Sequence, residues 1–212
     1  MNCSEVRREW AERTGEYSPE YYAYYGPDET SETIRRLLDR YVGRDASVLE
    51  LGCSSGRHLS HLRDHGYENL AGIEVNEDAL DVMEEHYPDL AADGTFYLDA
   101  IEDVVRDFDD GQFDAVYSVE TLQHLHPDVE WVFGELVRIT GDLLVTAENE
   151  GEGADETADE PARTVSSRVN FVDEGVPLYY RDWNRVFTEL GLVEETSSSS
   201  KRDTVRAFRR SR

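Results

Sequence analysis

Apolar residues recur along the chain in short blocks that predict alternating helices and strands. Helical spacing over residues 29–42 places five apolar side chains on one face, with Asp28 as a cap before them and Gly43 as a stop after them. Short apolar runs predict buried strands at residues 47–52, 70–75, 95–99, 113–119 and 142–148. Further helices are predicted at residues 56–66 and 77–87, the latter ending before Pro88, and from Asp128 onward. Such alternation predicts a parallel sheet with helices on both faces.

The pattern changes after residue 147. Residues 148–160 contain seven acids, no base and little to bury, which predicts a solvated acidic loop. Residues 168–180 fit no single pattern, and residues 182–191 again have helical spacing. The last segment, 192–210, predicts two strands around a serine-rich turn, which we expect as an antiparallel hairpin at the sheet edge.

Composition bounds the protein class. The 212 residues are enough for one domain with a substantial core, and Cys3 and Cys53 lie too far apart in sequence to indicate a disulfide framework. No run of about 18 apolar residues and no signal peptide is present, so we expect a cytoplasmic protein without a membrane partner.

The charge balance is strongly acidic, with 47 acids against 21 bases and a net charge of −26. Only one base, Lys201, is a lysine. Acids spread along the whole chain are typical of proteins that work in concentrated salt, so we expect a halophilic protein of archaeal type. The same charge repels phosphate backbones and argues against a nucleic-acid partner.

The stretch VLELGCSSGRHL, residues 48–59, joins a predicted strand to a predicted helix through a turn that contains Gly52 and Gly56. Glycine accepts positive φ angles and leaves room for a ligand to approach the backbone. Ligands of parallel sheets bind outside the carboxyl ends of the strands. A purely structural turn explains the glycines nearly as well, so this stretch alone does not define a site.

Acidic residues accompany the ends of the next strands. Glu74 ends the run at 70–75 and Asp99 ends the run at 95–99. Asp114, with the segment 117–126, is read as closing the run at 113–119. Carboxylates at neighbouring strand ends are expected to face one crevice, where an acid in the position of Glu74 can accept both hydroxyls of a ribose.

Together these motifs resemble class I S-adenosylmethionine-dependent methyltransferases over residues 30–147. ELGCSSG is similar to the first motif of that family, although Ser54 replaces its middle glycine. The resemblance implies a Rossmann-like α/β fold with a seven-stranded, mostly parallel sheet, helices on both faces and a C-terminal antiparallel hairpin. It also implies S-adenosyl-L-methionine as cofactor, bound by Glu50, Gly52, Cys53, Ser54, Gly56, Glu74, Val75, Asp99, Ala100, Ile101, Ser118 and Val119.

The acceptor side is less well defined by the sequence. We expect methyl transfer to a small molecule, with His124 as the candidate catalytic base after the fourth strand. Residues 1–28 are predicted to form an aromatic arm or lid, and residues 29–212 a single domain in which 147–181 form the variable acidic loop and a substrate cap. Substrate contacts are predicted for Tyr21, Tyr25, Glu120 and Tyr180.

Three histidines of one predicted helix, His58, His61 and His65, lie three and four residues apart. Because no carboxylate partner is evident nearby, we interpret them as a solvated face and expect no metal.

Other functions stay open at this point. A module that binds the donor without turnover, or a protein or RNA methyltransferase, fits the same motifs. Dinucleotide binding fits poorly, because Gly-x-Gly-x-x-Gly spacing is missing after Gly52.

Overall fold

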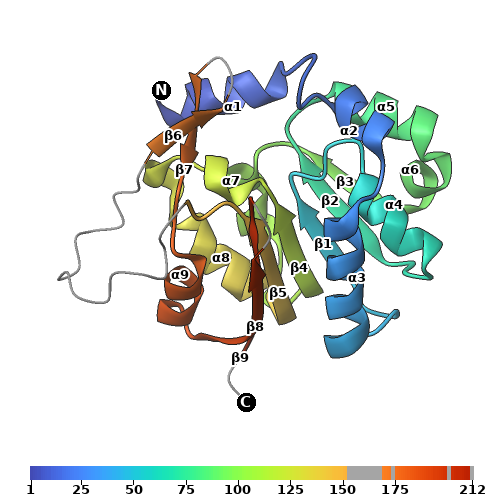
Figure 1. The fold of residues 1–212 in the computed structure, drawn as a ribbon. Coiled ribbons are helices and arrows are strands. Elements are labelled where there is room, and N and C mark those ends of the chain that lie inside the picture. Colours follow the sequence, from blue (N-terminus) through green and yellow to red (C-terminus); the bar gives the residue numbers. More distant parts are fainter. Residues whose placement is uncertain (152–168, 173–174, 200–201, 211–212) are drawn as a thin grey trace.

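The computed structural model describes residues 1–151, 169–172, 175–199 and 202–210. Most of the predicted acidic loop therefore lies outside the described residues. A seven-stranded sheet forms the centre of the molecule (Figure 1). From edge to edge it contains β3 (Thr95–Leu98), β2 (Leu70–Glu74), β1 (Val48–Leu51), β4 (Phe113–Val119), β5 (Thr140–Glu148), β9 (Thr204–Arg210) and β8 (Leu192–Ser199).

The sheet is parallel from β3 to β5, and the C-terminal hairpin is antiparallel. β1 pairs in parallel with both β2 and β4, so the strand order reverses beside β1. β9 pairs antiparallel with β5 and with β8, which confirms the predicted hairpin at the edge. The predicted fold class is confirmed, and the reversal beside β1 is where open α/β sheets bind ligands.

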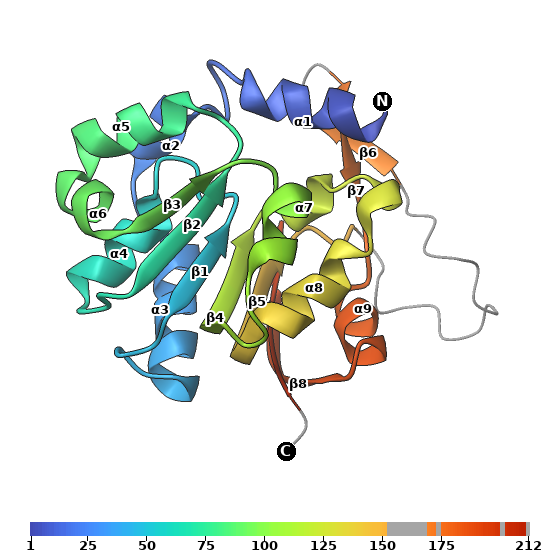
Figure 2. The ribbon, with the colours of Figure 1, turned by 180° about the vertical axis from the view of Figure 1, so that it is seen from behind.

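Helices cover both faces of the sheet (Figures 1 and 2). They are α3 (Glu29–Tyr41), α4 (Arg57–Asp64), α5 (Asp78–His86), α6 (Pro88–Asp93), α7 (Ile101–Val104), α8 (Val132–Ile139) and α9 (Trp183–Glu189). Short 3₁₀ helices are η1 (Val105–Asp107), η2 (Leu122–His124) and η3 (Pro127–Val129).

The buried apolar side chains form two clusters, and residues of the sheet contribute to both. Because side chains alternate along a strand, Val48 joins the cluster under α3 and α4, whereas Leu49 joins the cluster under α8 and α9. Trp183 is fully buried in the second cluster and stacks against Phe187, as a core residue of the last helix should.

Helix boundaries differ from the predicted pattern in two places. Pro88 does end α5, but it also occupies the first turn of α6, where its missing N–H costs nothing. The helix expected from Asp128 begins at Val132, because residues 127–129 form η3 instead. Residues 169–172 and 176–179, unassigned by the sequence pattern, pair as the antiparallel strands β6 (Val169–Val172) and β7 (Val176–Tyr179).

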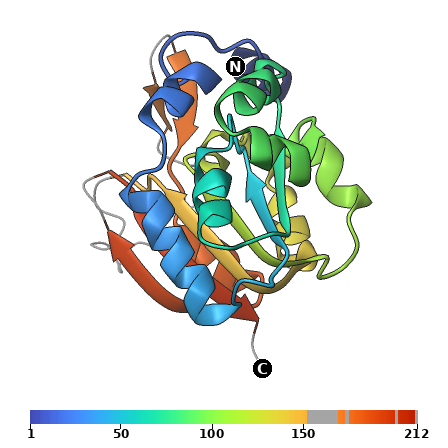
Figure 3. The ribbon, with the colours of Figure 1, turned by 90° about the vertical axis from the view of Figure 1, so that its right-hand side faces the viewer.

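The N-terminal segment contains two helices, α1 (Cys3–Ala11) and α2 (Pro19–Tyr25). Figure 1 and the side view of Figure 3 place α1 across the end of the sheet where the parallel strands finish, next to the β6–β7 hairpin. Asn2 and Glu5 form a capping box that starts α1. Among the described residues, no helix has the length and apolar content needed to span a membrane.

Candidate functional site

A cavity of about 190 Å³ lies at the carboxyl ends of β1 to β4, under α1. Most of the predicted site residues line it: Glu50, Gly52, Cys53, Ser54, Glu74, Val75, Asp99, Ala100, Ile101, Val119, Glu120 and His124. Five do not: Gly56, Ser118, Tyr21, Tyr25 and Tyr180. The parallel register brings strand ends that are 20 or more residues apart in sequence to one opening.

The turn after β1 has a conformation that few residues can adopt. Gly52 has φ of +67°, and a Cβ added there would lie 2.4 Å from Thr121 Oγ1. Ser54, which replaces the usual glycine, also has a positive φ of +48° and donates its backbone N–H to Glu74 Oε2 at 2.7 Å. Gly56 has a packing role instead, because a Cβ there would meet Leu90 at 2.8 Å.

Glu74 joins the glycine turn to the end of β2. Besides the Ser54 amide, its Oε1 accepts the N–H groups of Val75 at 2.7 Å and Asn76 at 2.8 Å. A carboxylate offers about four acceptor positions, so three are used and one is left for a ligand hydroxyl. Burial raises the pKa of Glu74, and the three backbone hydrogen bonds partly oppose that rise.

Glu50 is the second buried acid of the cavity. It is 1% exposed and accepts a hydrogen bond from the Tyr117 hydroxyl at 2.9 Å. Burial raises its pKa well above the ordinary value. A cationic ligand group beside Glu50 would reverse that effect by favouring the ionised carboxylate.

The end of β3 supplies the third side of the cavity. Asp99 Oδ1 accepts the Ala100 N–H at 2.8 Å, which fixes the carboxylate at the mouth of the strand. Three residues after Asp99, Glu102 forms an ion pair with Arg7 of α1 at 2.8 Å. The strand end therefore also anchors the N-terminal helix.

Asp114 is not at this edge, contrary to the expectation from sequence. It is the second residue of β4, where its Oδ2 accepts the Ser47 N–H at 2.8 Å. The error arose because an acid near a strand was assigned to the strand's end, whereas Asp114 lies five residues before Val119, the last residue of β4. The segment after β4 does reach the cavity through Val119 and Glu120.

A buried acid that the sequence reading missed holds the loop after β4. Glu148, the last residue of β5, accepts the N–H groups of Leu122 and Gln123, both at 3.1 Å, and the Ser118 hydroxyl. Burial raises its pKa to about 7. Ser118 therefore points to Glu148 and not to the cavity. The sequence signal for Glu148 was its position as an acid at the end of the predicted strand 142–148.

His124 is buried in η2 and borders the cavity. Its Nδ1 lies 3.1 Å from the Pro177 carbonyl, which can only accept, so Nδ1 carries the proton and Nε2 is the free base. Nε2 lies 3.3 Å from the Gln123 amide. Burial lowers the pKa of His124 to about 4, so the ring is neutral at physiological pH.

The N-terminal segment covers the cavity with aromatic residues other than those predicted. Tyr17 and Tyr22 line it, whereas Tyr21 and Tyr25 stack on each other, 4.8 Å between ring centroids, outside its lining. The reason is that α2 begins only at Pro19 and buries the face of Pro19 and Ala23.

Tyr180 also lies away from the cavity, where its hydroxyl accepts the Asn170 amide at 2.8 Å.

Trp10 and Asn76 were not predicted as site residues. The Trp10 ring packs on His124, with 4.6 Å between centroids, and its buried Nε1–H has no hydrogen-bond partner among the described residues. The Asn76 side chain donates to the carbonyls of Trp10 at 3.4 Å and Arg13 at 3.2 Å. Thus the loop after β2 holds α1 over the cavity.

Backbone strain also concentrates here. In the described part of the chain, the non-glycine residues with positive φ are Tyr17, Ser54 and Glu120, and all three line the cavity. Such conformations persist where the surroundings impose them, which is frequent at ligand sites.

The Rossmann-like fold is similar to that of solved S-adenosylmethionine-dependent methyltransferases. Residues 48–142 match the family model described as a methyltransferase domain. The crystal structure of 1,6-didemethyltoxoflavin-N1-methyltransferase from Burkholderia thailandensis, with 1,6-didemethyltoxoflavin and S-adenosylhomocysteine bound, is similar with a TM-score of 0.68. Sequence identity to it is 12%, covering 99% of this chain and 87% of that one.

Two curated proteins show similarity in sequence. The O-antigen chain terminator bifunctional methyltransferase/kinase WbdD of Escherichia coli is 31% identical over 91 residues, which is 42% of this chain and 12% of WbdD. Phosphoethanolamine N-methyltransferase 2 of Caenorhabditis elegans is 26% identical over 150 residues, 69% of this chain and 33% of the relative. The matched segments thus span a third or less of these relatives.

Proposed function

We propose that the chain binds S-adenosyl-L-methionine in this cavity and transfers its methyl group to a small-molecule acceptor. The observation that carries the proposal is the joint geometry of Gly52, Ser54 and Glu74. A strained glycine turn is tied by a backbone hydrogen bond to a buried carboxylate at the neighbouring strand end, beside a cavity. This arrangement suits a ribose, whose hydroxyls need an acceptor close to open backbone.

The lining residues fit such a donor in charge and shape. Glu74 would accept one ribose hydroxyl at its remaining acceptor position, and Asp99 with the backbone of Ala100 and Ile101 would hold the adenine. Glu50 would face the cationic end of the donor. The positive charge there would lower its raised pKa and so favour the ionised carboxylate. When ionised, the carboxylates of Glu50, Glu74 and Asp99 would supply negative charge, which is the sign required by a sulfonium and an ammonium.

When bound, S-adenosylmethionine supplies an electrophilic methyl group on its sulfonium. The main task of the chain is then orientation, which contributes up to about 7–11 kcal/mol in the best intramolecular reactions. Trp10 and Tyr22 would cover the cavity and exclude water from the transfer.

The acceptor class follows from the lining between α1, η2 and β7. Apolar and aromatic side chains dominate there, including Trp10, Leu125, Val129 and Leu178. The unpartnered Nε1–H of Trp10 offers one hydrogen-bond donor. This lining favours a small, largely apolar acceptor with one oxygen or nitrogen acceptor atom. Relatives named for small-molecule substrates support the small size of the acceptor.

His124 is our candidate base, acting through the unprotonated Nε2 once the acceptor displaces the Gln123 amide from it. A base works in its neutral form, so activity that depends on His124 is lost as pH falls through its pKa. With a pKa of about 4, turnover should show no His124-dependent loss between pH 8 and 6. An ordinary histidine would instead cause a loss near pH 6.5.

Two variants separate proton transfer from positioning. His124→Asn keeps an N–H donor near the position of Nδ1, and His124→Gln keeps a polar group near Nε2, but neither is a base. Release of S-adenosylhomocysteine is measured with fractionated metabolites in molar salt, with the exposed His86→Asn as control. Loss of about 100-fold or more in both variants supports a base. Activity retained by His124→Asn would leave His124 only a positioning role, and donor binding without any turnover would favour a non-catalytic module.

A further inference from the structure

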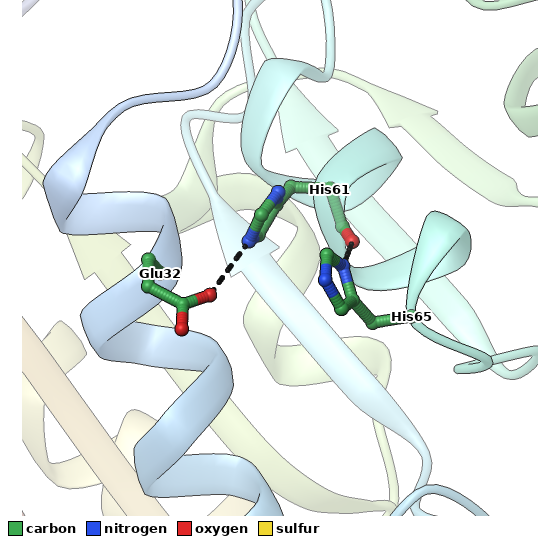
Figure 4. Close-up of side chains that lie close together, drawn as sticks. All are labelled: Glu32, His61 and His65. Carbon is green, nitrogen blue, oxygen red and sulfur yellow. Dashed lines mark hydrogen bonds and ion pairs between the residues drawn. The ribbon is translucent and has the colours of Figure 1, made fainter.

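A second cluster of ligand-forming side chains lies outside the cavity, on α3 and α4. His61 Nε2 lies 3.2 Å from Glu32 Oε2, and the rings of His61 and His65 are 4.4 Å apart at their centroids (Figure 4). One ligand atom from each of the three residues lies within 4.8 Å of the others. None of the three lines the cavity.

The fold creates this cluster from two separate helices. Residues 61 and 65 are one helical turn apart and therefore share a face of α4 and its C-terminal cap. Glu32 faces them from α3, which packs beside α4 (Figures 3 and 4). The premise that these histidines lack a nearby carboxylate was therefore wrong, because the partner comes from another element.

His58 does not belong to this group. It is buried, its Nδ1 lies 2.7 Å from the Ser31 hydroxyl, and it lines the cavity. The three histidines thus divide into one inward-facing residue and an outward pair.

The pair and the acid are oriented by neighbours in the manner of metal ligands. The His65 Nδ1–H donates to the His61 carbonyl at 2.8 Å, so in the neutral ring Nε2 is the nitrogen with a free lone pair. A backbone acceptor on the second ring nitrogen is the usual partner of a metal-binding histidine. The free Nε2 can therefore bind an ion without first losing a proton.

Two arginines fix the position of Glu32. Arg35 donates from Nε to Oε2 and from Nη2 to Oε1, and Arg36 donates from Nε to Oε1, each at 2.8 Å. The two arginines oppose a cation nearby, so the imidazoles must supply most of the affinity.

We propose that Glu32, His61 and His65 form a binding site for a first-row divalent transition metal ion, with Zn²⁺ as the best match. Two imidazoles and one carboxylate are a set that zinc uses, whereas Mg²⁺ and Ca²⁺ prefer oxygen ligands alone. Tetrahedral zinc needs ligand atoms about 3.3 Å apart, a separation that His61 and Glu32 already have. Rotation of the His65 side chain would bring its ring nitrogen to the same distance from the other two ligand atoms. To bind the ion through Nε2, His61 would release the Nε2 proton to solvent or carry it on Nδ1.

Such an ion would tie α3 to α4. The same two helices are already joined near the cavity by Arg57 and Asp28, 3.1 Å apart, and by His58 and Ser31. Because α4 starts directly after the glycine turn, an ion that joins α3 to α4 would also stabilise the position of that turn. The ion would not take part in methyl transfer. The role is structural.

The test is calorimetric titration of the chelator-treated full chain with ZnCl₂, in excess Mg²⁺ to occupy weak carboxylate sites. We expect one saturable zinc per chain and a rise in the unfolding midpoint on binding. His65→Gln should weaken zinc binding at least tenfold, as should His61→Gln, whereas the exposed His86→Gln should leave it unchanged.

Visible absorption of Co²⁺ in place of zinc provides a second readout, because tetrahedral nitrogen and oxygen ligation gives a band that octahedral Co²⁺ lacks. His65→Gln is the key variant, since in the metal-free chain its ring makes one local hydrogen bond and its loss should leave the fold intact. No saturable zinc binding by the wild type, or equal affinity in His65→Gln, would overturn the proposal.

Discussion

Backbone conformation at single residues limits what the turn after β1 can accept. Gly52 needs a positive φ and has Thr121 where a Cβ would stand. Ser54 adopts a positive φ with a side chain, at a cost of about 1–2 kcal/mol. This conformation directs the Ser54 N–H to the carboxylate of Glu74 at the end of β2.

Gly52→Ala should separate steric contact from backbone strain. Gly191 has a φ of +94° and nothing within 4 Å of an added Cβ, so Gly191→Ala carries the strain alone. We expect about 1–2 kcal/mol loss of unfolding free energy for Gly191→Ala and about 1–3 kcal/mol more for Gly52→Ala. Urea unfolding measures both, and equal losses would contradict the role of the Thr121 contact.

The sequence predicted residues well where one motif fixes one position. Glu50, Glu74 and Asp99 reach the cavity because each lies within one residue of the carboxyl end of a short parallel strand. Asn76, Trp10 and Glu148 could not be found in this way, since their roles depend on contacts between distant segments. Tyr22 lines the cavity, whereas Tyr21 and Tyr25 do not. The start of α2 at Pro19 decides this, because it fixes which face of the helix is buried.

At the scale of elements, the N-terminal segment depends on a few long-range contacts. α1 buries only Val6 fully, which explains why apolar spacing did not reveal it. The capping box of Asn2 and Glu5 was the local signal for its start. At its other end, Asn76 holds the carbonyls of Trp10 and Arg13.

Asn76→Ala should therefore loosen α1. Loss of its hydrogen bonds, about 1 kcal/mol each, should speed amide exchange over residues 3–13 and weaken S-adenosylmethionine binding several-fold. Asn69→Ala is the matched control, because Asn69 makes a similar side-chain bond to the Asp45 carbonyl on the exposed surface. Unchanged exchange in Asn76→Ala would show that α1 is held by other contacts.

Element types were predictable because long apolar runs and helical spacing dominate the core. Boundaries were less so. A proline both ends α5 and starts α6, and only the three-dimensional path of the chain distinguishes those outcomes. β6 and β7 pair with each other and not with the main sheet, which no local pattern in residues 168–180 indicates.

At the scale of the whole molecule, repulsion between acids opposes folding. The net charge of −26 leaves many carboxylates without a basic partner. Salt screens this repulsion over about 3 Å at 1 M, compared with about 10 Å at 0.1 M. A compact chain with this charge should therefore gain stability as salt is added.

We expect the unfolding midpoint to rise steadily in KCl from about 0.1 M to about 2 M, as screening shortens the range of repulsion. Circular dichroism during heating measures it. An unchanged or falling midpoint would contradict the interpretation of the acidic surface as an adaptation to salt.

The proposed function depends on binding of S-adenosylmethionine in the cavity at the ends of β1 to β4, with Glu74 on its ribose. Calorimetric titration in molar salt tests it with wild type, Glu74→Ala and Glu77→Ala, the last being exposed and outside the cavity lining. Because Glu74 also holds three backbone amides, Glu74→Gln and thermal unfolding without ligand check that the fold persists. We predict binding by wild type and Glu77→Ala and at least tenfold weaker binding by both Glu74 variants. Equal affinity in folded Glu74→Ala would contradict the proposed contact of Glu74 with the ribose. No binding by the wild type would contradict S-adenosylmethionine as the ligand of the cavity.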